Sequence, residues 1–143
     1  MDSPKSRCEI LLAQILPIVE QLLSRNGEFY PVGGGLRSDG KVDHLMPFDG
    51  RSMPPSDDLI EQLASTLRDG AANAQFEATA IIFDAKVTHP QTGKQTDAII
   101  AELEHRDNFI ATVVHPYHRE GGSLTFASGY ALEAGRGIFI RGR

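Results

Sequence analysis

Glu102 and Glu104 are the two residues of this chain whose type and spacing come nearest to a catalytic pair. They lie two positions apart in an extended segment, so both side chains leave the same face of a strand, about 6.5–7 Å apart. That separation overlaps the range for the two carboxyl groups of an inverting glycosidase. Such a pair normally flanks a cleft, whereas these two would lie side by side on one flat strand. The spacing alone is therefore weak support for glycoside hydrolysis.

The same carboxylates have two other interpretations when Asp84, on the preceding segment, is added to them. Three carboxylates could supply oxygen ligands to a divalent cation. Alternatively, they form an acidic surface, or the rim of an interface in which Lys86 provides the counter-charge. We favour the acidic surface or rim, and we predict no metal and no cofactor.

The spacing of the five histidines argues against zinc binding. If Arg106 to Asn108 form a tight turn, His105 lies at the turn end of a hairpin, opposite Phe109. His115 shares that face but lies about 20 Å away along the strands. These two side chains cannot bind one metal ion, and zinc needs several ligands around one point.

Tyr30, His115, Tyr117 and Arg119 form a second candidate group. Tyrosine and histidine side chains beside an arginine could line a small pocket or a binding edge. Alternatively, the two tyrosines cover an end of the sheet and keep their hydroxyls in water. We favour the second interpretation and predict no catalytic residue.

The run Gly33-Gly34-Gly35 superficially resembles a phosphate-binding loop. A P-loop, however, needs a Lys-Ser or Lys-Thr pair at the start of a helix, and this run leads into a hairpin turn. Nucleotide binding is therefore not expected. Glycines inside a strand predict a bulge or the close approach of a neighbouring segment.

Two amphipathic helices are expected to position these residues. The first starts at Ser3-Pro4, ends at Asn26-Gly27 and should kink at Pro17. Its apolar stripe contains Cys8, Leu11, Leu12, Ile15, Val19 and Leu22. The second helix is capped by Ser56. Its stripe contains Ile60, Leu63, Ala64, Leu67, Ala71 and Ala74. Each stripe should pack against a sheet.

The predicted strands lie on either side of the second helix. Residues 29–36 and 42–48 should form a hairpin around Asp39-Gly40. Three longer strands follow within residues 79–117, where apolar and polar residues alternate. A weaker strand or irregular segment covers 124–132, and residues 135–143 form a tail.

The three longer strands carry apolar residues on both faces. One alternating set contains residues such as Ile81, Ile99 and Phe109; the other contains Ile82, Ile100, Ile110 and Val114. A sheet covered on one side needs only the first set, and contiguous exposed apolar surface usually marks an interface. We therefore predict that the second face binds another copy of the chain. Its rim would be formed by Asp84, Lys86, Glu102 and Glu104.

The order α-β-β-α-β-β-β predicts a single α+β domain over residues 1–143, with two helices and a mainly antiparallel sheet of five to six strands. This order is similar to that of roadblock and profilin-like modules, which act as dimeric scaffolds or regulators. A second resemblance rests on Phe29-Tyr30-Pro31, Asp39-Gly40, the run from Glu102 to His105 and His115-Pro116-Tyr117. These look like the pattern of small bacterial proteins without an assigned activity. That resemblance implies no catalytic residue.

Composition narrows the class of partner. The net charge of −5 argues against nucleic acid, which is bound by clustered lysine and arginine. A single cysteine, Cys8, cannot form an internal disulfide. We expect no membrane-spanning segment and no signal peptide, and therefore a cytoplasmic protein.

Three functions remain open from the sequence. The leading hypothesis is a non-enzymatic interaction or scaffold domain that self-associates, as a homodimer, or binds a protein partner. The second is an acidic protein that neutralises a basic partner such as a toxin. The third is a small-ligand or metal-dependent enzyme that uses Glu102 and Glu104, which requires a pocket where several candidate side chains converge.

Overall fold

The computed structural model describes residues 3–47 and 55–139 of the chain. Along the chain, its elements are α1 (Pro4–Asn26), β1 (Val32–Leu36), β2 (Val42–Leu45), α2 (Ser56–Ala72), β3 (Ala78–Thr88), β4 (Gln95–His105), β5 (Phe109–Glu120), β6 (Ser123–Phe126) and β7 (Tyr130–Leu132). The strands pair antiparallel in the order β2-β1-β3-β4-β5-β6, and β7 also pairs with β5.

The predicted α+β class and the order of helices and strands are confirmed. Within the described residues the sheet has seven strands, because the region predicted as one weak strand forms both β6 and β7. The hairpin at Asp39-Gly40 is present, and the strand register at the Arg106–Asn108 turn pairs His105 with Phe109, as predicted.

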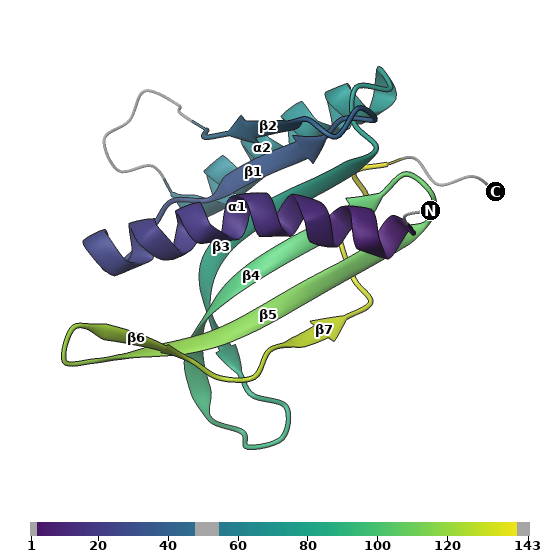
Figure 1. The fold of residues 1–143 in the computed structure, drawn as a ribbon. Coiled ribbons are helices and arrows are strands. Elements are labelled where there is room, and N and C mark those ends of the chain that lie inside the picture. Colours follow the sequence, from purple (N-terminus) through teal and green to yellow (C-terminus); the bar gives the residue numbers. More distant parts are fainter. Residues whose placement is uncertain (1–2, 48–54, 140–143) are drawn as a thin grey trace.

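The two helices cover opposite faces of the sheet. In Figure 1, α1 crosses in front of the sheet, where it packs on β1, β3 and β4, and α2 lies behind it against β1 and β3. We call these surfaces the α1 face and the α2 face. On the α1 face the helix buries Cys8, Leu11, Ile15, Val19 and Leu23. On the α2 face, the cluster contains Ile60, Leu63, Ala64, Leu67, Phe76 and Ile81.

The boundaries of α1 follow from its capping residues. The Ser3 hydroxyl accepts a hydrogen bond from the Ser6 N–H at 3.0 Å, as expected for an N-cap. At the other end Gly27 adopts φ +80°, a left-handed conformation that favours glycine, and donates to the Leu23 carbonyl. Pro17 lies on the exposed side, and the helix continues through it.

The start of α2 differs from the prediction by one residue. Pro55 occupies the N-cap position without a side-chain hydrogen bond, and Ser56 is the first helical residue. Asp57 and Asp58 lie in the first turn, where their negative charge stabilises the helix.

The glycine run in β1 lets both helices approach the sheet closely. A Cβ atom at Gly34 would lie 2.3 Å from the Ile15 side chain of α1. On the α2 face, a Cβ at Gly35 would lie 2.3 Å from Phe76. The run is therefore required by packing, which confirms the predicted close approach.

The prediction that Ile82 shares a face with Ile100 and Val114 is wrong. Ile82 pairs with Ala101, so it points to the α1 face, where it is fully buried. Ile100 pairs with Phe83 and Val114, and these residues point to the α2 face. The two-residue period fixes which residues of one strand share a face. It does not fix how the faces of separate strands match, because the connecting loop sets their register.

The segment predicted as a tail is packed as far as the structure describes it. Residues 133–139 pass behind β5 and β4 on the α2 face (Figure 1). Ile138 and Phe139 are buried in the cluster of α2. The prediction of a tail is therefore wrong for Gly135 to Phe139, and residues 140–143 lie outside the described part of the chain.

Candidate functional site

Glu104 holds the C-terminal segment by its main chain. Its carboxylate accepts hydrogen bonds from the N–H groups of Gly137 at 2.7 Å, Ile138 at 2.8 Å and Phe139 at 3.3 Å. The side chain is 2% exposed. A buried carboxylate is stable only when its charge is met by such donors. Glu104 therefore has a structural partner, which accounts for its burial.

Glu102 is also engaged by the C-terminal segment. Its Oε1 accepts from Nε of Arg136 at 2.5 Å, and Arg136 lies 3.4 Å from Glu61 of α2. Burial raises the pKa of Glu102, while the Arg136 guanidinium opposes that shift. The two glutamates share a face as predicted, yet both contact the protein's own chain and neither faces an open cleft.

Asp84 lies on the opposite face from the two glutamates. It pairs with Ile99 and accepts a hydrogen bond from the Tyr117 hydroxyl at 2.8 Å. Burial raises the pKa of Asp84, and burial together with the Asp84 carboxylate raises the pKa of Tyr117. The proposed grouping of Asp84 with Glu102 and Glu104 is therefore wrong, because β3 presents Asp84 to the α1 face. Lys86 pairs instead with Asp97, at 3.1 Å.

The four residues of the second candidate group separate in the fold. Tyr117 is buried against Asp84, and Arg119 donates to the Leu23 carbonyl at the C-terminal end of α1. His115 lies in the middle of β5, and Tyr30 lies between α1 and β1. The structure therefore does not bring these side chains to one point. Both favoured tyrosine hydroxyls in water also need correction, since that of Tyr117 is bonded.

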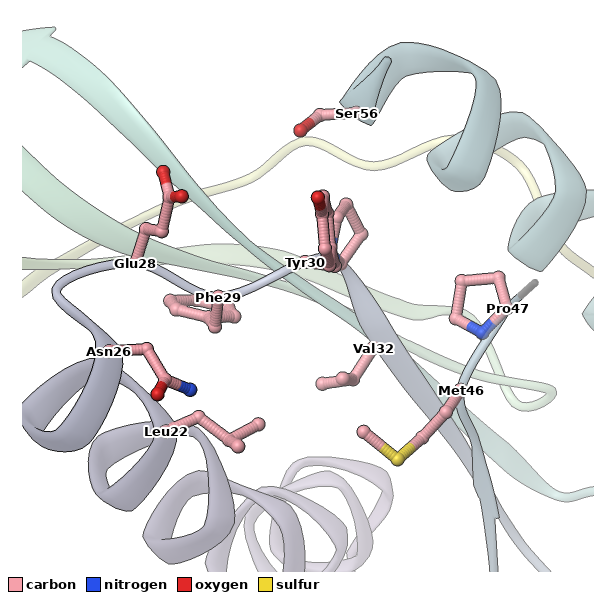
Figure 2. Close-up of a pocket in the computed structure, with 10 residues that line it drawn as sticks. Leu22, Asn26, Glu28, Phe29, Tyr30, Val32, Met46, Pro47 and Ser56 are labelled. Carbon is pink, nitrogen blue, oxygen red and sulfur yellow. The ribbon is translucent and has the colours of Figure 1, made fainter. Parts of the chain in front are cut away.

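Tyr30 borders a cavity of about 420 Å³ near the C-terminal end of α1. Figure 2 shows apolar Leu22, Val32 and Met46 along one side of it, and the oxygen atoms of Glu28, Tyr30 and Ser56 along the other. Tyr30 and Met46 are exposed. The described walls are mostly apolar, and they contain no pair of groups suited to proton transfer.

A second opening, of about 470 Å³, lies on the α1 face of β5. We call it the β5 groove. Its floor contains Leu103, Phe109, Ala111 and Val113, and its walls are Lys5 and Glu9 of α1 and residues 129–131. Phe109 and Val113 are only partly buried because α1 packs mainly on β1, β3 and β4. Sequence reasoning assigned these side chains to the core, and their period gives no sign that the helix stops short of β5.

His115 lies at one end of the β5 groove. Its Nε2 atom is buried and has no hydrogen-bond partner. Burial lowers the pKa of His115, while the carboxylate of Glu20 opposes that shift. An unpaired buried nitrogen costs stability, so it calls for an explanation.

A buried ionic cluster was not predicted from the sequence. Arg7 donates to Glu77, whose Oε1 lies 3.7 Å from Nε2 of His105. The His105 Nδ1 accepts from the Asp107 N–H at 3.0 Å, and burial lowers the pKa of His105. The cluster joins the start of α1 to the β4–β5 turn. Arg7 and Glu77 are far apart in the sequence, so no local pattern could reveal their pairing.

Comparison with known proteins adds no assignment. No protein-family model matches the chain, and no curated protein and no solved structure is significantly similar to it. Both resemblances noted in the sequence therefore rest on element order and short motifs alone. Within the described residues, no helix is both long and apolar enough to cross a membrane.

Proposed function

We propose that this chain is a non-enzymatic, cytoplasmic protein-interaction domain that self-associates through the β5 groove. The observation that carries the proposal is the incomplete cover of β5. Phe109, Ala111 and Val113 form a continuous apolar strip that α1 leaves partly open. Open apolar strips of this kind commonly mark interaction sites.

This surface replaces the one expected from the sequence. Ile100 and Val114 are 6% and 3% exposed, and residues 130–139 lie over that part of the α2 face. They offer no contact area to a partner while the C-terminal segment is in place. The motive for self-association therefore passes from the α2 face to the β5 groove, where apolar side chains remain partly open.

The carboxylates support binding over catalysis. Glu102 is paired with Arg136, and Glu104 accepts three main-chain hydrogen bonds. A general acid or base must reach the substrate proton. Groups that are already committed to the protein's own chain are poor candidates for that role.

Substitution of Val113 by lysine tests the proposal. Sedimentation velocity over a range of concentrations should detect a dimer of the natural chain, and Val113→Lys should weaken it by about tenfold or more, because a contact of this kind would bury the ammonium group. Leu132→Lys is the matched control, since Leu132 is exposed on the opposite side of the sheet. It should leave the dimer unchanged.

Thermal denaturation must show that both lysine variants remain folded. A natural chain that sediments as a monomer at every concentration would contradict self-association. A dimer that both variants retain would contradict the assignment of the groove.

A further inference from the structure

The C-terminal arm, which we define as residues 133–139, is bound mainly by side chains of other elements. Glu104 takes the three main-chain N–H groups of residues 137–139, and the Thr112 hydroxyl donates to the Ala134 carbonyl at 2.9 Å. Arg68 of α2 donates to the carbonyls of Arg136 and Gly137. The arm is no part of the strand ladder, so its place does not depend on pairing that extends from β7.

The site that receives the arm, the arm slot, is specific for it. One end holds Glu102 against Arg136, the middle holds Glu104, and the far end is an apolar cluster that buries Ile138 and Phe139. Gly135 lies against Ile110, so closely that a Cβ atom there would be 2.4 Å from Ile110 Cγ1. Charge, main-chain donors and apolar side chains of the arm all have matching partners.

The arm slot is costly to leave empty. Removal of the arm would leave the Glu104 carboxylate without three donors and would open the apolar cluster beside it. A buried charge without donors is strongly unfavourable. A molecule whose arm has left the slot therefore favours any chain that restores the same contacts.

The connection to the arm is suited to a change of direction. Residues 131–135 are all exposed, and the main-chain bond within them, from the Ala134 N–H to the Leu132 carbonyl, is local. Movement of this hinge would disturb few contacts apart from those of the arm. The arm of a second copy would then supply every contact that is lost.

We propose that two copies of this chain exchange their C-terminal arms, each arm filling the arm slot of the other copy. The exchanged dimer keeps the arm contacts of the monomer, so it forms at a cost that is mainly the entropy of association. It is favoured by high concentration. The contact is separate from the β5 groove and does not depend on the function proposed for that groove.

Cysteines at the two facing positions test the exchange. The double variant Ile110→Cys with Gly135→Cys should form a disulfide within one chain, because the two side chains face each other at contact distance. This control shows that the variants fold and that the arm occupies its slot. The two single variants are then mixed at high concentration, diluted and oxidised.

Arm exchange predicts a disulfide-linked dimer that contains one chain of each single variant. Neither single variant alone should give that product, and Cys8, which is buried, should not contribute. The oxidised double variant should stay monomeric where the unlocked chain forms the exchanged dimer. Val113→Lys should leave the exchange intact, which separates it from association through the groove. A mixture that gives no linked dimer, although the double variant forms its internal disulfide, would overturn the proposal.

Discussion

At the residue scale, the most informative side chains are polar ones that are buried. Glu104 has three main-chain donors, whereas Nε2 of His115 has none. The first arrangement stabilises the fold, and the second opposes it. The contrast separates a carboxylate that the structure uses from a histidine that the structure tolerates.

We predict that His115→Leu stabilises the protein at neutral pH by about 1 kcal/mol, because it removes an unpaired buried nitrogen. The folded state lowers the pKa of His115, so below the unfolded value of about 6.5 the unfolded chain binds the proton more readily. Stability from this residue is therefore lost as the pH falls. Urea denaturation should show that the advantage of the variant grows between about pH 7 and pH 5. A constant difference would contradict this account.

At the element scale, β1 is where both helices meet the sheet. Its central glycines are fully surrounded, with Ile15 above Gly34 and Phe76 below Gly35. A side chain at either position would push a helix away. The run is thus a spacing device between three layers, and its likeness to a phosphate loop has no structural counterpart.

Gly34→Ala should destabilise the protein by about 1–3 kcal/mol, because its Cβ would overlap Cδ1 of Ile15. Ile15→Val removes that atom. A double-mutant cycle measured by chemical denaturation should therefore show that the two changes together cost less than the sum of their separate costs. Strict additivity would mean that the contact with Ile15 is not the cause.

At the scale of the whole molecule, stability is expected to differ between the arm and the central strands. β3 and β4 pair along their full length inside the sheet, whereas the arm is fixed by a few side chains and two buried apolar residues. Regions with few contacts open first in native proteins. The arm should therefore open before the sheet does.

Native-state hydrogen exchange of Glu104→Gln tests this order. The substitution removes the charge that accepts the three arm N–H groups, so exchange at Gly137, Ile138 and Phe139 should become at least about tenfold faster, which corresponds to a loss of about 1.4 kcal/mol. The amides of β3 and β4 should change less. Glu61→Gln is a suitable control, since Glu61 is largely exposed. Equal acceleration throughout the sheet would show that the arm and the sheet open together.

Much of the fold could be predicted from the sequence because its signals are local. Ser3 and Gly27 delimit α1, Asp39-Gly40 marks a hairpin, and the turn after His105 sets the pairing of β4 with β5. Each of these features depends on neighbouring residues, whose backbone preferences and hydrogen bonds act over a few positions.

The candidate site could not be predicted in the same way, because it depends on contacts between distant parts of the chain. Alternation showed that Glu102 and Glu104 share a face, but only the folded chain brings the arm over them. Likewise, the period of two could not match the faces of β3 and β4, so Ile82 was assigned to the wrong side. The sequence by itself determined the elements and their order. The tertiary structure decided which faces are covered, since burial depends on where a helix or an arm comes to rest and not on the periodicity of the strand beneath it.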